Sequence, residues 1–117
     1  MTRSDYQDQL GEKLVSLDTA VGHVESGSTV AAAPYTCSPM TLCRGLAERA
    51  ERGEVEGIRM DHLAAFFPWT DPRWASAFHL TDTYATPANR AACIAGEVGY
   101  LPVGAWREDE IPAGWSS

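Results

Sequence analysis

A hydroxyl residue is followed by proline at two places in this sequence, Ser38-Pro39 and Thr86-Pro87. At such pairs, free backbone N–H groups can bind a ligand. A Ser or Thr at the N-cap accepts a hydrogen bond from a free backbone N–H group, and a proline at the first helical position loses none, so each pair predicts a helix start. Free N–H groups and the dipole at a helix start stabilise negative charge that develops on a bound oxygen. The loop before the first pair therefore predicts a binding site for such an oxygen, with an ordinary capped turn as the alternative. Its residues are Pro34, Tyr35, Thr36, Cys37 and Ser38.

The cysteines and histidines are weaker candidates for a functional site than this loop. Cys37 lies at a predicted helix start, where a lowered thiol pKa would make it a nucleophile; a small, partly buried cysteine without catalysis is the interpretation that we favour. The spacing places no histidine beside it as a base, and structural roles are predicted for His23, His62 and His79. The cysteine count of 3 is odd and fits neither a disulfide framework nor a metal-ligand spacing. The sequence thus predicts reduced thiols, no metal site and no catalytic residue.

Aromatic and charged residues are further candidates. Aromatic side chains gather between Phe66 and Phe78, where they either line an apolar ligand pocket or, as we favour, cover the sheet. Arg90 opens the second predicted helix, where a cation opposes the helix dipole; it either pairs with another chain or an acidic ligand, or is a solvated surface side chain. Trp106 and Trp115 are predicted to contact another subunit, because tryptophan is enriched at binding hot spots, and packing back on the core is the alternative.

Hydrophobic periodicity predicts the helices that would position these residues. Apolar residues spaced by three or four predict one helix or two short ones between Tyr6 and Val24. Ser16 is the N-cap that would divide them, and Gly27 would end the second. The other predicted helices span residues 39–52 and 87–95, with stops at Gly53 and Gly96.

The strands complete the predicted fold. Short runs bounded by turn residues predict a buried strand at residues 29–33 and further strands at 55–63, 79–85 and 100–103. Prolines break the aromatic segment into a loop with one short helix near Asp71-Pro72. The repeat of strand, turn and helix is typical of the α/β class, so we predict a small parallel sheet flanked by helices. Ligands of such sheets bind at the carboxyl ends of the strands, where the two hydroxyl–proline pairs lie.

Length and charge exclude several functions. A chain of 117 residues that is 44% hydrophobic can bury one modest core, which predicts a single domain over residues 1–117. The net charge of −7, with only 9 scattered Lys and Arg residues, argues against nucleic acid or anionic lipid as a partner. No apolar run approaches the roughly 18 residues of a membrane span, and the first residues lack the apolar region of a signal peptide. We therefore expect a cytoplasmic protein.

Several short motifs occur in a specific order. They are Gly27-Ser28-Thr29-Val30, Leu46-Ala47-Glu48-Arg49, Asn89-Arg90-Ala91-Ala92, Tyr100-Leu101-Pro102 and Glu110-Ile111-Pro112. In order and spacing they resemble the N-terminal part of the acetyl-CoA hydrolase and 4-hydroxybutyrate CoA-transferase group of family I CoA-transferases. The resemblance runs from about Tyr6 to Pro112, nearly the whole sequence.

The resemblance implies a partial CoA-transferase domain. Members of the group continue past the position of Pro112 into further strands and a second domain, whose glutamate forms the covalent acyl and CoA intermediates, and no residue here matches that glutamate. The chain is then a small subunit or split half that is inactive alone and is completed by a larger, glutamate-bearing polypeptide. It would shape the acyl pocket for acyl transfer or thioester hydrolysis, with a coenzyme A thioester as substrate and no tightly bound cofactor.

The loop at residues 34–38 departs from that group, which usually carries glycines where the backbone approaches the acyl thioester. Larger side chains here imply either an acyl group of different size or a loop that no longer binds a thioester. Two alternatives therefore stay open: a non-catalytic binding or regulatory module that self-associates or regulates a full-length enzyme, and a standalone enzyme that uses Cys37. An unpaired sheet edge predicts that the chain associates with itself or with a partner, whether it is a split subunit or a binding module.

Overall fold

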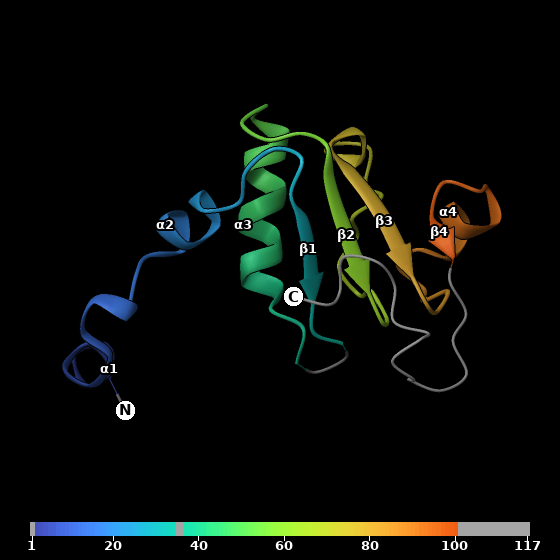
Figure 1. Cartoon of the computed structure of the whole chain (residues 1–117). Coiled ribbons are helices and arrows are strands. Elements are labelled where there is room, and N and C mark those ends of the chain that lie inside the picture. The colour runs from blue at the N-terminus through green and yellow to red at the C-terminus, as the bar shows by residue number, and fades with distance from the viewer. Residues whose placement is uncertain (1, 35–36, 101–117) are drawn as a thin grey trace, which may run out of the picture.

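The computed structural model describes residues 2–34 and 37–100. Its centre is a four-stranded sheet with the strand order β1-β2-β3-β4 (Figure 1). The strands are β1 (Thr29–Ala32), β2 (Ile58–His62), β3 (Phe78–Asp82) and β4 (Gly99–Tyr100). All three neighbouring pairs are parallel, so their carboxyl ends meet at one edge of the sheet. The predicted α/β class with a small parallel sheet is confirmed.

Helices precede and connect the strands. They are α1 (Arg3–Leu10), the 3-10 helix η1 (Gly11–Lys13), α2 (Leu17–Gly22), α3 (Met40–Glu51), the 3-10 helix η3 (Ala75–Ala77) and α4 (Arg90–Ile94). The predicted division at Ser16 is confirmed, because its side chain accepts a hydrogen bond of 3.1 Å from the Thr19 N–H. The predicted end at Gly27 is wrong. Gly27 has a φ of 81° in a turn beyond α2, and its N–H donates to the Glu56 carbonyl at 3.0 Å, so this glycine joins the chain before β1 to the chain before β2.

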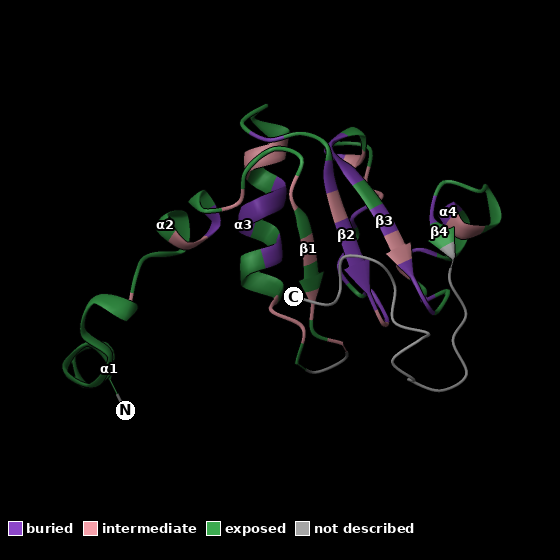
Figure 2. Cartoon of the chain, viewed as in Figure 1, coloured by how far each residue is buried: buried purple, intermediate pink, exposed green. Residues whose placement is uncertain are grey.

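The core lies around β2 and β3, where buried residues concentrate (Figure 2). Ile58 and Met60 of β2 are 0% and 1% exposed, and they belong to one cluster with Leu46 and Ala47 of α3. The prediction that the first strand is buried is wrong. Residues of β1 alternate between exposed and half-buried, because β1 pairs only with β2 and forms an edge of the described sheet.

The first helix stands away from the sheet (Figure 1). A capping box between Thr2 and Asp5 begins α1, but α1 contains no buried residue. Tyr6 and Leu10, which the periodicity places on an apolar helix face, are 45% and 44% exposed. Only the second half of that predicted face is buried, through Val21 of α2.

Element boundaries differ from prediction in the second half of the chain. The short helix predicted near Asp71-Pro72 forms later, as η3, because the Trp74 N–H and the Ala75 N–H both donate to the Asp71 carbonyl and make a turn there. The last strand begins at Gly99, one residue before its predicted start. The remainder of that prediction, residues 101–103, lies outside the described residues, as do Trp106 and Trp115.

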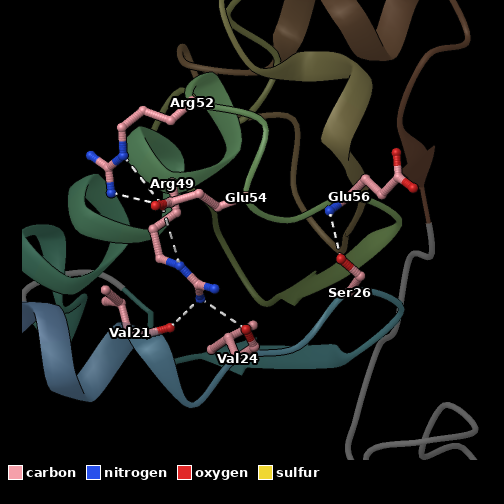
Figure 3. Close-up of polar contacts among 7 residues, drawn as sticks. All are labelled: Val21, Val24, Ser26, Arg49, Arg52, Glu54 and Glu56. Carbon is pink, nitrogen blue, oxygen red and sulfur yellow. Dashed lines mark hydrogen bonds and ion pairs between the residues drawn. The ribbon is translucent and has the colours of Figure 1, made fainter.

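Arg49, a half-buried residue of α3, joins this helix to α2. The Arg49 guanidinium donates to the Val21 and Val24 carbonyls at the end of α2, the second at 2.8 Å (Figure 3). The Val21 carbonyl lies in the last turn of α2 and the Val24 carbonyl just beyond the helix, in the region where backbone acceptors run short of intrahelical partners. Arg49 therefore ties down the end of α2, and this contact holds α2 against the core.

Replacing Arg49 with methionine is expected to lower the free energy of unfolding by about 2 kcal/mol, because it keeps an apolar stem but removes both charged hydrogen bonds. Urea denaturation of both proteins measures the difference. The matched control is Arg52→Met, since the exposed Arg52 side chain bonds to Glu54 at the surface, and its loss should change the midpoint little. Glu54 also lies 3.8 Å from the Arg49 guanidinium, so the difference between the two variants reports the carbonyl contacts of Arg49. Equal effects of the two substitutions would contradict the role of Arg49.

Candidate functional site

The loop that follows β1 lies at the carboxyl edge of the sheet. The Cys37 N–H donates to the Pro34 carbonyl at 3.1 Å, and the Met40 N–H donates to the Ser38 carbonyl at 2.9 Å. The Cys37 side chain is exposed, while Pro34 and Ser38 are half-buried. Tyr35 and Thr36 lie outside the described residues. The structure thus places the described part of the predicted loop where parallel α/β sheets bind ligands.

The start of α3 differs from its prediction. Ser38 is not the N-cap: α3 begins at Met40, its N-cap is Pro39, and no side chain caps it. The Ser38 hydroxyl instead donates to the Ala33 carbonyl at 2.9 Å, back toward the end of β1. The first turn of α3 contains no acidic residue either. Within the described residues, the N–H groups of this turn have no side-chain acceptor. The Met40 N–H is bonded to the Ser38 carbonyl, which leaves the N–H groups of Thr41 and Leu42 at the positive end of the helix dipole for a bound oxygen.

The second hydroxyl–proline pair also acts differently. The Thr86 hydroxyl donates to the Ala65 carbonyl in the loop after β2, and residues 87–89 form a turn before α4 begins at Arg90. The predicted helix start at Pro87 is wrong for this reason: Thr86 holds two loops together rather than capping a helix. Arg90 is exposed at the first position of α4.

A buried carboxylate organises this edge of the sheet. Asp82, at the end of β3, is 0% exposed. Its Oδ2 accepts from the Ala65 N–H at 2.8 Å and from the Asn89 amide at 2.7 Å. Its Oδ1 accepts from the Thr83 and Tyr84 N–H groups at 2.7 and 3.1 Å. Sequence reasoning did not select Asp82, although an aspartate at the carboxyl end of a predicted parallel strand is a usable signal.

Two buried polar atoms at the neighbouring strand end have no hydrogen-bond partner among the described residues: Asp61 Oδ2 and His62 Nδ1. His62 is 2% exposed, and its Nε2 accepts from the Trp69 indole N–H at 2.9 Å. Nε2 therefore carries no proton in this contact, and the neutral ring is protonated at Nδ1. Burial lowers the pKa of His62, against the opposing effect of the Asp82 and Asp61 carboxylates. His23 and His79 are exposed.

Lowering the pH below about 6.5 is expected to destabilise the protein through His62. Its pKa is lower in the folded state than in the unfolded state, so the unfolded chain binds more protons as the pH falls and stability is lost. Above the unfolded pKa this contribution is fully present. Urea denaturation between pH 7.5 and pH 5 measures the slope, which should shrink in His62→Gln and persist in the exposed-site control His79→Gln. An unchanged slope in His62→Gln would contradict this assignment.

The aromatic segment forms a packed cluster. Phe67, Trp69, Trp74 and Phe78 are all buried, with ring centroids of Trp69 4.6 Å from Phe67 and 4.7 Å from Phe78. The guanidinium carbon of Arg73 lies 4.4 Å from the centroid of the Trp74 ring. The segment therefore covers the sheet, and Trp69 also lines a cavity beside β1.

The described residues hold no group of His, Cys, Asp and Glu side chains that could bind a metal ion. Cys37, Cys43 and Cys93 are all free thiols. Within residues 2–34 and 37–100, none of the helices has the length and apolar character needed to cross a bilayer.

The fold and its carboxyl edge define an open, parallel α/β domain. No protein-family model matches the sequence, and no curated protein matches it. Among solved structures, the fold is similar to RipA from Yersinia pestis, with a TM-score of 0.72 and 22% identity over 86% of this chain and 26% of that chain. A point mutant of RipA matches with a TM-score of 0.73 and 23% identity, over 85% of this chain and 25% of that chain. These likenesses show the fold, and this chain spans about a quarter of the length of RipA.

Proposed function

We propose that this chain is a partial CoA-transferase-like domain over residues 1–117. In this proposal it is a small subunit or split half of a CoA-transferase or acyl-CoA-processing enzyme. The observation that carries the proposal is the uncapped start of α3 directly after the loop at residues 34–38, at the carboxyl edge of a parallel sheet. The motif order that resembles family I CoA-transferases supports it, as does a fold shared with part of a much longer protein.

The chemistry of this edge suits binding better than catalysis. The N–H groups of Thr41 and Leu42, in the first turn of α3, can stabilise a thioester oxygen as it gains negative charge. The described residues offer no activated nucleophile: His62 is buried and its Nε2 is occupied by Trp69. We therefore assign the covalent step to a glutamate on a larger partner polypeptide. The substrate is a coenzyme A thioester, no cofactor is tightly bound, and the setting is the cytoplasm, consistent with three free thiols.

The second candidate is a non-catalytic binding or regulatory module that self-associates or binds a full-length enzyme. The composition of the loop favours it, since Pro34, Tyr35 and Cys37 replace the glycines expected beside a thioester. Such a module would keep the fold and the open edge strand β1 without binding an acyl-CoA.

The experiment measures thiol release from butyryl-CoA by the purified chain alone, and then by the chain mixed with a purified CoA-transferase-like polypeptide that carries the catalytic glutamate. We expect no turnover alone and turnover in the mixture, because the partner supplies the glutamate. In the active mixture, Tyr35→Gly should broaden the range of acyl groups accepted. Binding to the partner without any turnover would favour the regulatory module.

Turnover by the chain alone that survives repurification would refute the split-enzyme proposal. Loss of that turnover in Cys37→Ser would then identify the standalone thiol enzyme. Cys37→Ser is otherwise expected to leave the mixture active, because Cys37 is given no covalent role.

A further inference from the structure

A cavity of about 270 Å³ lies between α2, β1 and α3. It extends from the exposed Leu42 on α3 to the buried side chains of Met60 and Trp69 beneath. Ala20 of α2 and Val30 of β1 also line it. The cavity therefore connects the surface with the core beside the first turn of α3.

The walls of this cavity are apolar. Its side-chain polar groups are the Trp69 indole N–H, which already donates to His62, and the Cys43 thiol. Burial raises the pKa of that thiol to about 11, so it is neutral at physiological pH. A buried water needs two to four polar partners, whereas apolar cavities stay dry or bind apolar molecules. The lining thus suits an apolar ligand rather than water.

The mouth of the cavity has the opposite character. Pro39 and Leu42, which line the cavity, belong to the N-cap and the first turn of α3. Among the described residues that turn has no side-chain cap and no acidic residue. The Met40 N–H donates to the Ser38 carbonyl, so the N–H groups of Thr41 and Leu42, at the positive end of the helix dipole, are the ones available. A ligand that fits both features has an apolar chain attached to a carboxylate or carbonyl oxygen.

We propose that this cavity binds the unbranched apolar chain of an acyl group, with the acyl oxygen directed to the uncapped start of α3. A cavity of about 150 Å³ accepts benzene, so this larger one has room for roughly six to eight carbons. The identity of the acyl carrier rests on the proposed function, whereas binding of the chain itself does not. The cavity, and not only the loop at residues 34–38, then selects acyl length.

The test is an NMR titration of the full chain with sodium acetate, butyrate, hexanoate and octanoate, followed by the methyl resonances of Val30 and Leu46. Each added methylene should tighten binding about fourfold until the cavity is full. Hexanol should bind more weakly than hexanoate, because it lacks the anionic oxygen that the helix start favours.

Two variants that fill the cavity from different elements, Ala20→Leu and Val30→Phe, should each weaken octanoate binding at least tenfold. Ala91→Leu makes the same change on the exposed face of α4 and should leave binding unchanged. Far-UV circular dichroism checks that each variant folds. If only one of the two filling variants folds, that variant is enough for the test.

Absence of methyl shifts with octanoate, or equal octanoate binding in the parent and both filling variants, would overturn the inference. Hexanol binding as tight as hexanoate would overturn the place given to the acyl oxygen. If octanoate binds as expected but no mixture releases thiol from butyryl-CoA, the proposed function fails and the cavity assignment stands. If an active mixture keeps its acyl-length preference in Ala20→Leu, the assignment fails and the function stands.

Discussion

Replacing Asp82 with alanine is expected to lower the free energy of unfolding by about 3–5 kcal/mol, a large share of the stability of a small domain. The substitution leaves the Ala65 N–H, the Asn89 amide and the Thr83 N–H without their acceptor in a site that excludes water. The loops after β2 and β3 should lose their common anchor. Urea denaturation measures the loss, and amide hydrogen exchange at Ala65 and Thr83 should show it locally.

The control for this experiment is Asp71→Ala. The half-buried Asp71 bonds to the exposed side chain of Arg73, two residues further on, so its replacement should leave the urea midpoint close to that of the parent. Asp82→Asn should fall between the two, because an amide keeps the shape but offers a donor where the site supplies donors. A loss below about 1 kcal/mol in Asp82→Ala would contradict the anchoring role.

Replacing Trp69 with alanine is expected to cost about 3–5 kcal/mol, since Trp69 is 1% exposed and packs against Phe67 and Phe78. Trp69→Phe keeps much of this packing and removes the hydrogen bond to His62, so it should cost about 1–3 kcal/mol. Urea denaturation followed by far-UV circular dichroism measures both.

Tyr84→Ala is the matched control, because the Tyr84 residue is 51% exposed and its replacement should cost less than about 1 kcal/mol. If Trp69→Phe destabilises as much as Trp69→Ala, the hydrogen bond to His62 dominates and the packing argument is wrong. If Trp69→Ala resembles Tyr84→Ala, the aromatic segment does not hold the sheet.

The sequence was sufficient to predict the class of fold, because periodicity and turn residues are local signals. The apolar stripe of α3 and its stop at Gly53, which has a φ of 77°, could be read directly. The N-cap at Ser16 was found for the same reason, since its acceptor and the donating Thr19 N–H lie three residues apart. Direction of the strands followed from the repeat of strand, turn and helix.

The candidate site was less predictable because its polar groups form hydrogen bonds with residues that are distant in sequence or lie in other loops. Ser38 and Thr86 have the sequence of helix caps, yet their hydroxyls donate to the carbonyls of Ala33 and Ala65. A hydroxyl can donate or accept, and local sequence cannot decide which when an acceptor from another loop is near. The contact of Asp82 with Ala65 likewise depends on two loops that meet only in the folded sheet.

Because each strand of this sheet pairs with the next strand along the chain, no pairing in the described sheet has to wait for a strand beyond the next one. Paired residues lie 30 positions apart in β1 and β2, 20 apart in β2 and β3 and 18 apart in β3 and β4. The cost of closing a loop grows only slowly with its length, so the three closures cost similar amounts. We expect β1, α3 and β2 to assemble first and β3 and β4 to add in order. The domain can therefore acquire structure from its N-terminal side while the ribosome is still extending the chain.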